Sequence, residues 1–167
     1  MATRTEWYRD NLLISTNPSL IQPAAVNSAF GSDMMHWCKP VDEALLKKML
    51  DNSLCFGVYE LPSSSAEIAG RASPRQIGLA RLVTDHVSTA YLTDVYIVKE
   101  HQGKGIGKWL IQCVNETLET WPELRWALLV NTGPTKFYEE TLGMTVYADG
   151  RDGVKIMSKL GPGDVNH

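Results

Sequence analysis

Three glycines alternate along residues 102–107, which read QGKGIG. An apolar-rich run precedes them at 91–98, and an amphipathic run follows them as far as Trp121. Because the first turn of a helix carries unpaired N–H groups, a glycine turn between a strand and a helix can hold an anion at the helix start. The stretch therefore predicts an anion-binding site, with phosphate as the leading ligand.

Basic side chains crowd the start of the predicted helix. Lys99, His101, Lys104 and Lys108 lie there with one acidic neighbour, Glu100. A helix start carries a partial positive charge and normally attracts acidic side chains. The reversed pattern indicates that a strongly negative group, such as a pyrophosphate, docks on the turn; a solvated basic face is the alternative.

The turn departs from the two commonest phosphate-binding motifs. A P-loop needs glycine at position 102 and serine or threonine at position 109, where this chain has Gln102 and Trp109. A dinucleotide-binding fingerprint needs its third glycine where Lys108 stands. An ordinary tight turn between a strand and a helix remains the structural alternative.

The turn resembles instead the acyl-CoA-binding motif of the GNAT superfamily of N-acetyltransferases, Gln/Arg-x-x-Gly-x-Gly/Ala. Residues 94–101, DVYIVKEH, are similar to the strand and loop that precede this motif in the family. Residues 131–144, NTGPTKFYEETLGM, resemble a second family segment, in which Asn131 and Tyr138 keep the family spacing of seven. That stretch departs from the family at Pro134 and Met144, and by one extra residue before Gly143.

The resemblance implies an α+β fold with a mixed, mostly antiparallel central sheet flanked by helices. The acyl-CoA would lie at a splay between the fourth and fifth strands. Periodicity and turn residues predict strands at 7–16, 54–61, 76–84, 91–98, 126–130, 145–148 and 154–160, and helices at 23–35, 41–50, 106–121 and 134–141. The unalternating run 126–130 predicts a strand that is covered on both faces.

The chain is expected to form one domain, 1–167, because its length suits a single core. Residues 62–75 are rich in serine, proline and alanine and predict a mobile hairpin loop. Residues 161–167 predict a frayed tail.

The family resemblance implies acetyl-CoA as cosubstrate and no metal. It places the acyl-CoA along the fourth strand, the glycine turn and the second motif. The residues implied to bind it are Tyr96, Ile97, Val98, Gln102, Gly103, Lys104, Gly105, Ile106, Gly107, Lys108, Asn131 and Tyr138.

Acetyl transfer also needs donors for the charge that develops on oxygen and on sulfur. In the family a bulge frees a backbone N–H for the thioester oxygen, and the candidates here are the amides of Ile97 and Val98. The hydroxyl of Tyr138 is the implied proton donor to the departing thiolate; a core tyrosine is its structural alternative. No covalent acyl-enzyme is required.

A protonated amine must lose a proton before it attacks, so a base is expected. The resemblance implies Asp94, with Asp85 and His86 behind it. The structural alternative is that Asp94 caps a backbone group or pairs with a neighbouring lysine.

The predicted activity is acetyl transfer from acetyl-CoA to the primary amine of a small molecule by direct attack in a ternary complex. Trp37 falls in the segment where the family binds its acceptor, and it is the candidate substrate-binding residue. Two alternatives stay open: acetylation of a protein N-terminus or lysine, and a non-catalytic acyl-CoA sensor.

Composition sets the remaining expectations. A formal net charge of −3 gives no broad basic surface for nucleic acid, and no apolar run is long enough to cross a membrane. The cysteines Cys38, Cys55 and Cys113 form no CxxC motif and predict reduced thiols in a cytoplasmic protein, with the nucleus as a further location. A homodimer is left open.

Overall fold

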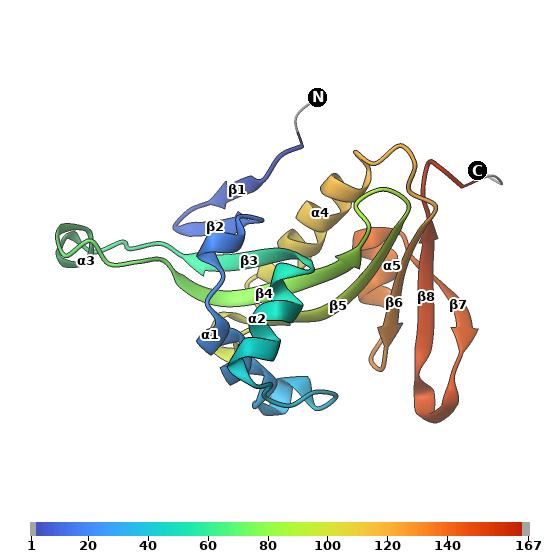
Figure 1. Ribbon diagram of the computed structural model, residues 1–167, viewed down its shortest axis with the longest axis horizontal. Coiled ribbons are helices and arrows are strands. Elements are labelled where there is room, and N and C mark those ends of the chain that lie inside the picture. Colours follow the sequence, from blue (N-terminus) through green and yellow to red (C-terminus); the bar gives the residue numbers. More distant parts are fainter. Residues whose placement is uncertain (1–2, 165–167) are drawn as a thin grey trace.

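A computed structural model of the chain describes residues 3–164, with nothing described for the side chain of Arg151. An eight-stranded sheet runs through it in the order β1-β2-β3-β4-β5-β6-β8-β7 (Figure 1). Its strands are β1 (Glu6–Arg9), β2 (Leu12–Ser15), β3 (Leu54–Glu60), β4 (Arg75–Thr84), β5 (Thr89–Ile97), β6 (Trp126–Asn131), β7 (Thr145–Asp149) and β8 (Lys155–Leu160). Neighbouring strands are antiparallel except β5 and β6, which are parallel. This is the mixed, mostly antiparallel sheet that the resemblance predicted.

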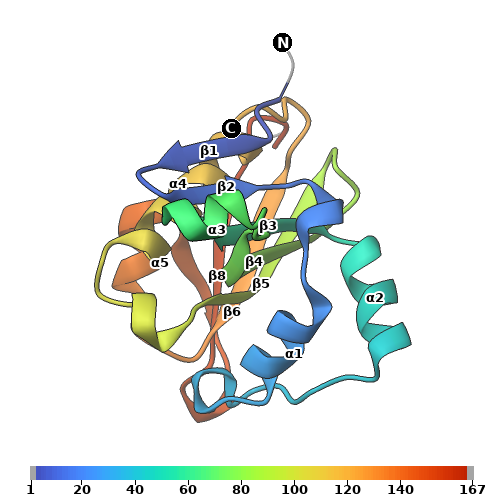
Figure 2. The ribbon, with the colours of Figure 1, turned by 90° about the vertical axis from the view of Figure 1, so that its left-hand side faces the viewer.

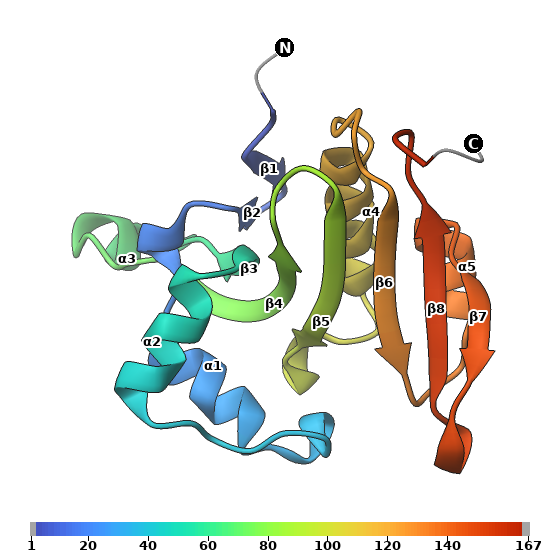
Figure 3. The same ribbon diagram turned by 45° about the vertical axis from the view of Figure 1, so that its right-hand side comes forward.

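Helices cover both faces of the sheet, which lies between them in Figure 2. The helices of the fold are α1 (Pro23–Phe30), α2 (Glu43–Asp51), α3 (Ser65–Ala69), α4 (Ile106–Leu118) and α5 (Lys136–Leu142), with short 3-10 turns at η1 (Pro18–Leu20), η2 (Asp33–Met35), η3 (Lys99–His101) and η4 (Arg151–Gly153). Helices α4 and α5 lie on one face of the sheet, and α1 and α2 lie on the other (Figure 3). The buried side chains of each pair belong to the core beneath that face. No helix within residues 3–164 is both long enough and apolar enough to span a bilayer.

Helix α4 follows from the apolar stripe in its sequence. Its side chains at Ile106, Leu110, Val114 and Leu118 recur at intervals of four and are all buried. The helix ends at Leu118 rather than near Trp121, but the Trp121 amide still donates to the Leu118 carbonyl at 3.1 Å. This helix is therefore a rigid support for the glycine turn that precedes it.

Two predicted elements near the N-terminus are shorter than expected. The single strand predicted at 7–16 is the hairpin β1–β2, because the chain reverses at Asp10, whose φ of 51° lies in the left-handed region. The first helix ends at Phe30 and not at residue 35, since Gly31 caps it and the chain re-forms only the short turn η2.

The stretch 62–75 contains a helix that composition did not predict. Helix α3 begins at a capping box, in which the Ser64 hydroxyl accepts from the Glu67 amide and the Glu67 carboxylate accepts from the Ser64 amide. Figure 1 shows α3 at the tip of an arm that extends from β3 and β4 away from the rest of the sheet. The mobility predicted for this stretch stays a prediction.

The prediction that β6 is covered on both faces is wrong. Ala127 and Leu129 are buried beneath the helices, whereas Val130 points away from them and is 50% exposed. The strand therefore alternates like the strands of a sheet with one covered face.

The first part of the predicted tail is attached to the fold. The amides of Gly161 and Gly163 donate to the carbonyls of Arg125 and Leu124 at 2.9 and 2.8 Å. A side chain at Gly161 would lie 2.1 Å from the Leu124 oxygen, so glycine is required at this close approach. Residues 165–167 lie outside the described residues.

Buried thiols and phenols should make the fold sensitive to alkali. Burial raises the pKa of the Cys55 thiol from 9.0 to about 11 and that of Cys113 to about 12. Burial also raises the pKa of Tyr59 and Tyr96, whose hydroxyls have no hydrogen-bond partner in the described part of the chain. Because the folded state keeps protons that the unfolded state loses, the free energy of unfolding should fall as the pH rises from about 9 to 12.

Urea unfolding at a series of pH values measures this dependence. In the Cys55→Ala variant the free energy of unfolding should fall less steeply between pH 9 and 11. The difference in slope should be up to ~1.4 kcal/mol per pH unit, which is the contribution of one proton. A free energy of unfolding that stays level up to pH 11 would contradict the prediction.

Candidate active site

A β-bulge interrupts β5 in front of the glycine turn. In the pairing of β4 with β5, Asp94 and Val95 stand opposite Ala80 alone. Asp94 takes a φ of 50°, a left-handed conformation that aspartate tolerates better than most residues. The bulge implied by the resemblance is therefore present, and it reorients the strand end that leads into the glycine turn.

The Asp94 carboxylate is held in a buried ion pair. Its Oδ2 accepts from Nε of Arg81 at 2.7 Å, and the two side chains are 8% and 12% exposed. The same guanidinium donates to the Ser53 hydroxyl at 3.0 Å. Of the two roles considered for Asp94, the structure provides the pairing, with an arginine in place of the expected lysine, and the role of general base stays a prediction.

The two residues expected behind Asp94 lie elsewhere. Asp85 and His86 form the turn between β4 and β5, and the nine residues of β5 separate that turn from the glycine turn. Hydrogen bonds from the Ser88 hydroxyl and from nearby backbone N–H groups hold the pKa of Asp85 well below its ordinary value. Asp85 therefore stabilises a turn, and neither residue is placed to act as the base.

One of the two candidate amides, that of Val98, already has a hydrogen-bond partner within the fold. The Val98 amide donates to the Ile77 carbonyl at 2.9 Å, which removes Val98 as a free donor. Because successive amides of a strand point to opposite edges, the Ile97 amide points away from β4, toward the side of β6. Pairing of β5 with β6 ends at Leu92 and Leu129, so the strand ladder provides no partner for this amide.

The parting of β5 from β6 is the predicted splay. The two strands pair over only four residue positions, and Figure 3 shows them side by side at one end and diverging toward their C-terminal ends. The bulge at Asp94 lies where the pairing has stopped.

The glycine turn has the backbone shape of an anion cradle. Gly103 and Gly105 have φ values of 75° and 76°, and no atom of the described residues lies within 4 Å of where their side chains would stand. Gly105 is the N-cap of α4, whose first turn holds no acidic residue. Within residues 3–164, Lys104 and Lys108 form no ion pair, so their charges remain available to an anion.

The side chain of Gln102 fastens this turn to the end of β5. Its Nε2 donates to the Ile97 carbonyl at 2.8 Å. Gly107 lies within the first turn of α4 and has an ordinary backbone conformation. A side chain there would meet Ile97 at 3.9 Å, an ordinary van der Waals contact.

Two cavities meet at the splay. The turn cavity, about 430 Å³, is lined by Met34, Val95, Tyr96, Ile97, His101, Gln102, Gly103, Gly105, Ile106, Gly107, Lys108, Phe137 and Tyr138. The splay cavity, about 370 Å³, is lined by His36, Trp37, Tyr91, Leu92, Thr93, Asp94, Val95, Leu129, Val130, Asn131, Thr132, Gly133 and Tyr138. Val95 and Tyr138 line both cavities, so a group bound in one lies next to a group bound in the other.

Most of the predicted binding residues line the turn cavity. Val98, Lys104 and Asn131 do not, and Asn131 lines the splay cavity instead. Sequence reasoning missed Val95 as a shared wall, although it follows Asp94 directly, and Phe137, which precedes Tyr138. It also missed Tyr91, which lines the splay cavity. Its position within the predicted strand was the one feature of the sequence that pointed to it.

Asn131 shapes the turn that delivers Tyr138. Its Nδ2 donates to the Gly133 carbonyl at 2.9 Å, and its Oδ1 accepts from the Gly133 amide at 3.1 Å. The turn leads into α5, where Tyr138 packs at the edge of the core and edge to face against Phe137. Burial raises the pKa of Tyr138 to about 12, so its hydroxyl carries a proton at neutral pH.

Trp37 forms part of the splay cavity, in the segment between η2 and α2. It is 50% exposed and meets the His36 ring edge to face with centroids 5.1 Å apart. A large ring face therefore remains open to a ligand.

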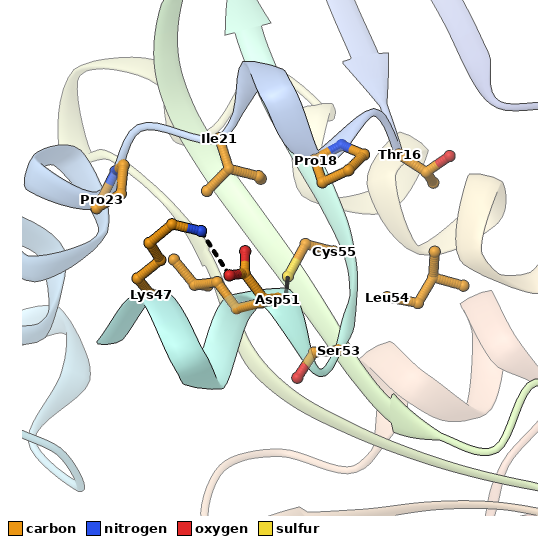
Figure 4. A pocket seen from close by; sticks show the side chains of 10 residues that line it. Thr16, Pro18, Ile21, Pro23, Lys47, Asp51, Ser53, Leu54 and Cys55 are labelled. Carbon is orange, nitrogen blue, oxygen red and sulfur yellow. Dashed lines mark hydrogen bonds and ion pairs between the residues drawn. The ribbon is translucent and has the colours of Figure 1, made fainter. Parts of the chain in front are cut away.

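A third cavity lies apart from the predicted site. It is about 320 Å³ in volume and lies between η1 and the end of α2, with the Lys47 and Asp51 ion pair along one side (Figure 4). Cys55 lines it, but the raised pKa of this thiol keeps it protonated and a poor nucleophile. None of the predicted site residues lines this cavity.

Comparison with known proteins identifies the family. Residues 65–141 match the model of the acetyltransferase (GNAT) domain. A Gibberella zeae protein, whose name assigns it provisionally to the acetyltransferases, is 41% identical over 165 residues, covering 94% of this chain and 93% of that protein. The chain belongs to the GNAT acetyltransferase family. It is therefore an acetyl-CoA-dependent N-acetyltransferase, as its two motifs predicted.

Solved structures support the GNAT fold. A crystal structure from Xanthomonas campestris pv. campestris, of a protein assigned to the GNAT family, has a TM-score of 0.60 and 26% identity and covers 83% of this chain and 87% of that one. Spermidine N-acetyltransferase from Vibrio cholerae, in complex with CoA and spermine, has a TM-score of 0.63 and 20% identity and covers 91% of this chain and 96% of that one. The likeness to the second structure concerns the fold alone.

Proposed function

We propose that this GNAT enzyme transfers the acetyl group of acetyl-CoA to the primary amine of a small molecule, by direct attack in a ternary complex. The observation that carries the proposal is that Tyr138 and Val95 line both cavities. A donor in the turn cavity and an acceptor in the splay cavity would then meet beside the Tyr138 hydroxyl. The compact volume of the splay cavity favours a small acceptor over a protein segment.

The chain's own groups suit acetyl-CoA. Backbone N–H groups at the start of α4, with Lys104 and Lys108, would hold the diphosphate. Beyond Leu92, the unpaired backbone of β5 offers N–H and C=O groups that can bond to the amide groups of acetyl-CoA. Bound acetyl-CoA supplies the thioester; the Ile97 amide would stabilise negative charge on its oxygen.

Tyr138 would complete the reaction by stabilising the departing sulfur through its hydroxyl. As the amine attacks the thioester carbon, a C–N bond forms and the C–S bond breaks. The proton lost by the amine balances the one that the CoA thiol gains. No cysteine takes part, in line with the raised pKa values of Cys38, Cys55 and Cys113.

Measuring the release of free CoA from acetyl-CoA with a panel of small amines, and separately with peptides, tests the proposal. Release with at least one primary amine is expected. Binding of acetyl-CoA without release by any amine would favour a sensor, and release with peptides alone would favour a protein acceptor.

Gly105→Asp should weaken acetyl-CoA binding roughly 10- to 100-fold, the effect of losing one hydrogen bond to a charged group. The added carboxylate would face the diphosphate, and any side chain is less favourable than glycine at the φ of 76° found here. Titration calorimetry measures the affinity.

Gly153→Asp is the matched control. Gly153 also has a φ of 76°, and within the part of the chain that the structure describes nothing lies within 4 Å of where its side chain would stand, but it belongs to η4 and lines neither cavity. Both variants should lower the melting temperature similarly, and only Gly105→Asp should affect binding. Equal affinities in the two variants would refute the phosphate site.

A further inference from the structure

We infer that the acceptor is an aromatic monoamine rather than a polyamine, an inference that rests on the proposed function. The splay cavity is where the acceptor would bind, and its walls combine two features. They carry aromatic rings from separate parts of the fold, and the described residues that form them carry no uncompensated negative charge.

The rings come from three segments of the chain. His36 and Trp37 precede α2, Tyr91 lies on β5, and Tyr138 lies on α5. Trp37 and Tyr91 are 50% and 36% exposed, so part of each ring is free to contact a ligand. Aromatic side chains offer large apolar contact areas, and stacked or edge-to-face ring pairs gain further stabilisation.

Aliphatic side chains form the rest of the apolar lining of the splay cavity. Leu92, Leu129 and Val130 come from β5 and β6, on the two sides of the splay. A cavity of about 370 Å³ lies at the small end of the range for ligand sites, which suits one ring with a short amine-bearing chain.

The charge balance argues against a polyamine. Asp94 is the one carboxylate among the described residues that line the cavity, and Arg81 already neutralises it at 2.7 Å. A polyamine would bring two or more ammonium groups into a site with no free carboxylate to receive them, at a large desolvation cost. A single ammonium group can instead lie against the Trp37 ring, since cations are attracted to aromatic faces.

A comparison of the enzyme's activity on two classes of amine tests the inference. The wild-type chain is assayed for CoA release with phenethylamine and tryptamine, and separately with spermidine and spermine, at saturating acetyl-CoA. The aromatic monoamines should show kcat/KM at least about tenfold higher than the polyamines.

Trp37→Ala should lower kcat/KM for the aromatic monoamines about tenfold, mainly through KM, and Trp37→Phe should restore most of it. Tyr147→Ala is the control, because Tyr147 is an exposed aromatic residue on β7 that lines neither cavity. It should leave kcat/KM unchanged. Acetyl-CoA affinity should be the same in all these variants.

A preference for spermidine or spermine overturns the inference, and so does an absence of release with aromatic monoamines. A Trp37→Ala variant that keeps its full kcat/KM does the same. Each of these results leaves acetyl-CoA binding and transfer to other amines intact. Failure of the proposed function itself would appear differently, as no acetyl-CoA binding or no release with any amine.

Discussion

Tyr138→Phe is expected to lower kcat by about 100-fold or more, within the range for loss of a group that donates a proton in the transition state. The hydroxyl is the one polar side-chain group of a residue shared by both cavities, so it would lie at the reacting sulfur. The affinity for acetyl-CoA should stay nearly unchanged, because binding depends mainly on the glycine turn. Stopped assays of CoA release measure kcat, and calorimetry measures affinity.

The raised pKa of Tyr138 defines how it acts. A hydroxyl with a pKa of about 12 does not fully protonate a thiolate of ordinary basicity, so it would donate a hydrogen bond and pass on its proton only as it regains the one lost by the amine. Since the neutral form is the active one and persists to about pH 12, ionisation of Tyr138 should not reduce kcat between pH 7 and 10.

Tyr147→Phe is the matched control for this prediction. It removes the same hydroxyl from a tyrosine on β7 that is 65% exposed and lines neither cavity. Its kcat should equal that of the wild-type chain. A Tyr138→Phe variant with kcat within threefold of wild type would show that the hydroxyl is not needed at the sulfur.

Arg81→Met should lower the free energy of unfolding by about 3–5 kcal/mol, the typical cost of leaving one member of a buried ion pair without its partner. Asp94 is 7% exposed and occupies a bulge with φ of 50°, so it cannot move into solvent without rebuilding β5. Urea unfolding measures the loss.

Two further variants separate the buried charge from other effects. The double variant Arg81→Met with Asp94→Asn should recover a substantial part of the stability, because asparagine removes the charge and tolerates left-handed backbone. Lys47→Met breaks the exposed pair with Asp51 and should cost less than about 1 kcal/mol. Equal losses for Arg81→Met and Lys47→Met would contradict the prediction.

Local signals explain what the sequence predicted well. The glycine turn and α4 depend on residues that are neighbours in the chain, since the apolar stripe begins directly at Ile106. The position of the splay followed from the family resemblance. In contrast, α3 was missed although Ser64 and Glu67 form a recognisable capping box, because the composition around them indicated a loop.

Features that depend on strand register could not be predicted from the sequence. The partner of Asp94 is Arg81, which lies across the β4–β5 hairpin beside the bulge. The Val98 amide was an equal candidate with Ile97 until the pairing with Ile77 was known. In both cases the deciding contact joins residues that no local pattern links.

The short pairing of β5 with β6 has a consequence for the whole molecule. Strands β1 to β5 form one half of the sheet, and β6, β8 and β7 form the other. Among the described residues, the strand ladder that joins the halves spans four residue pairs, and the Arg125 amide adds one hydrogen bond to the Ser88 carbonyl. A ligand that hydrogen-bonds to both β5 and β6 where they are unpaired would connect the two halves of the sheet. Binding of such a ligand would then strengthen the contact between the two halves, and the free energy of unfolding would increase with the ligand concentration.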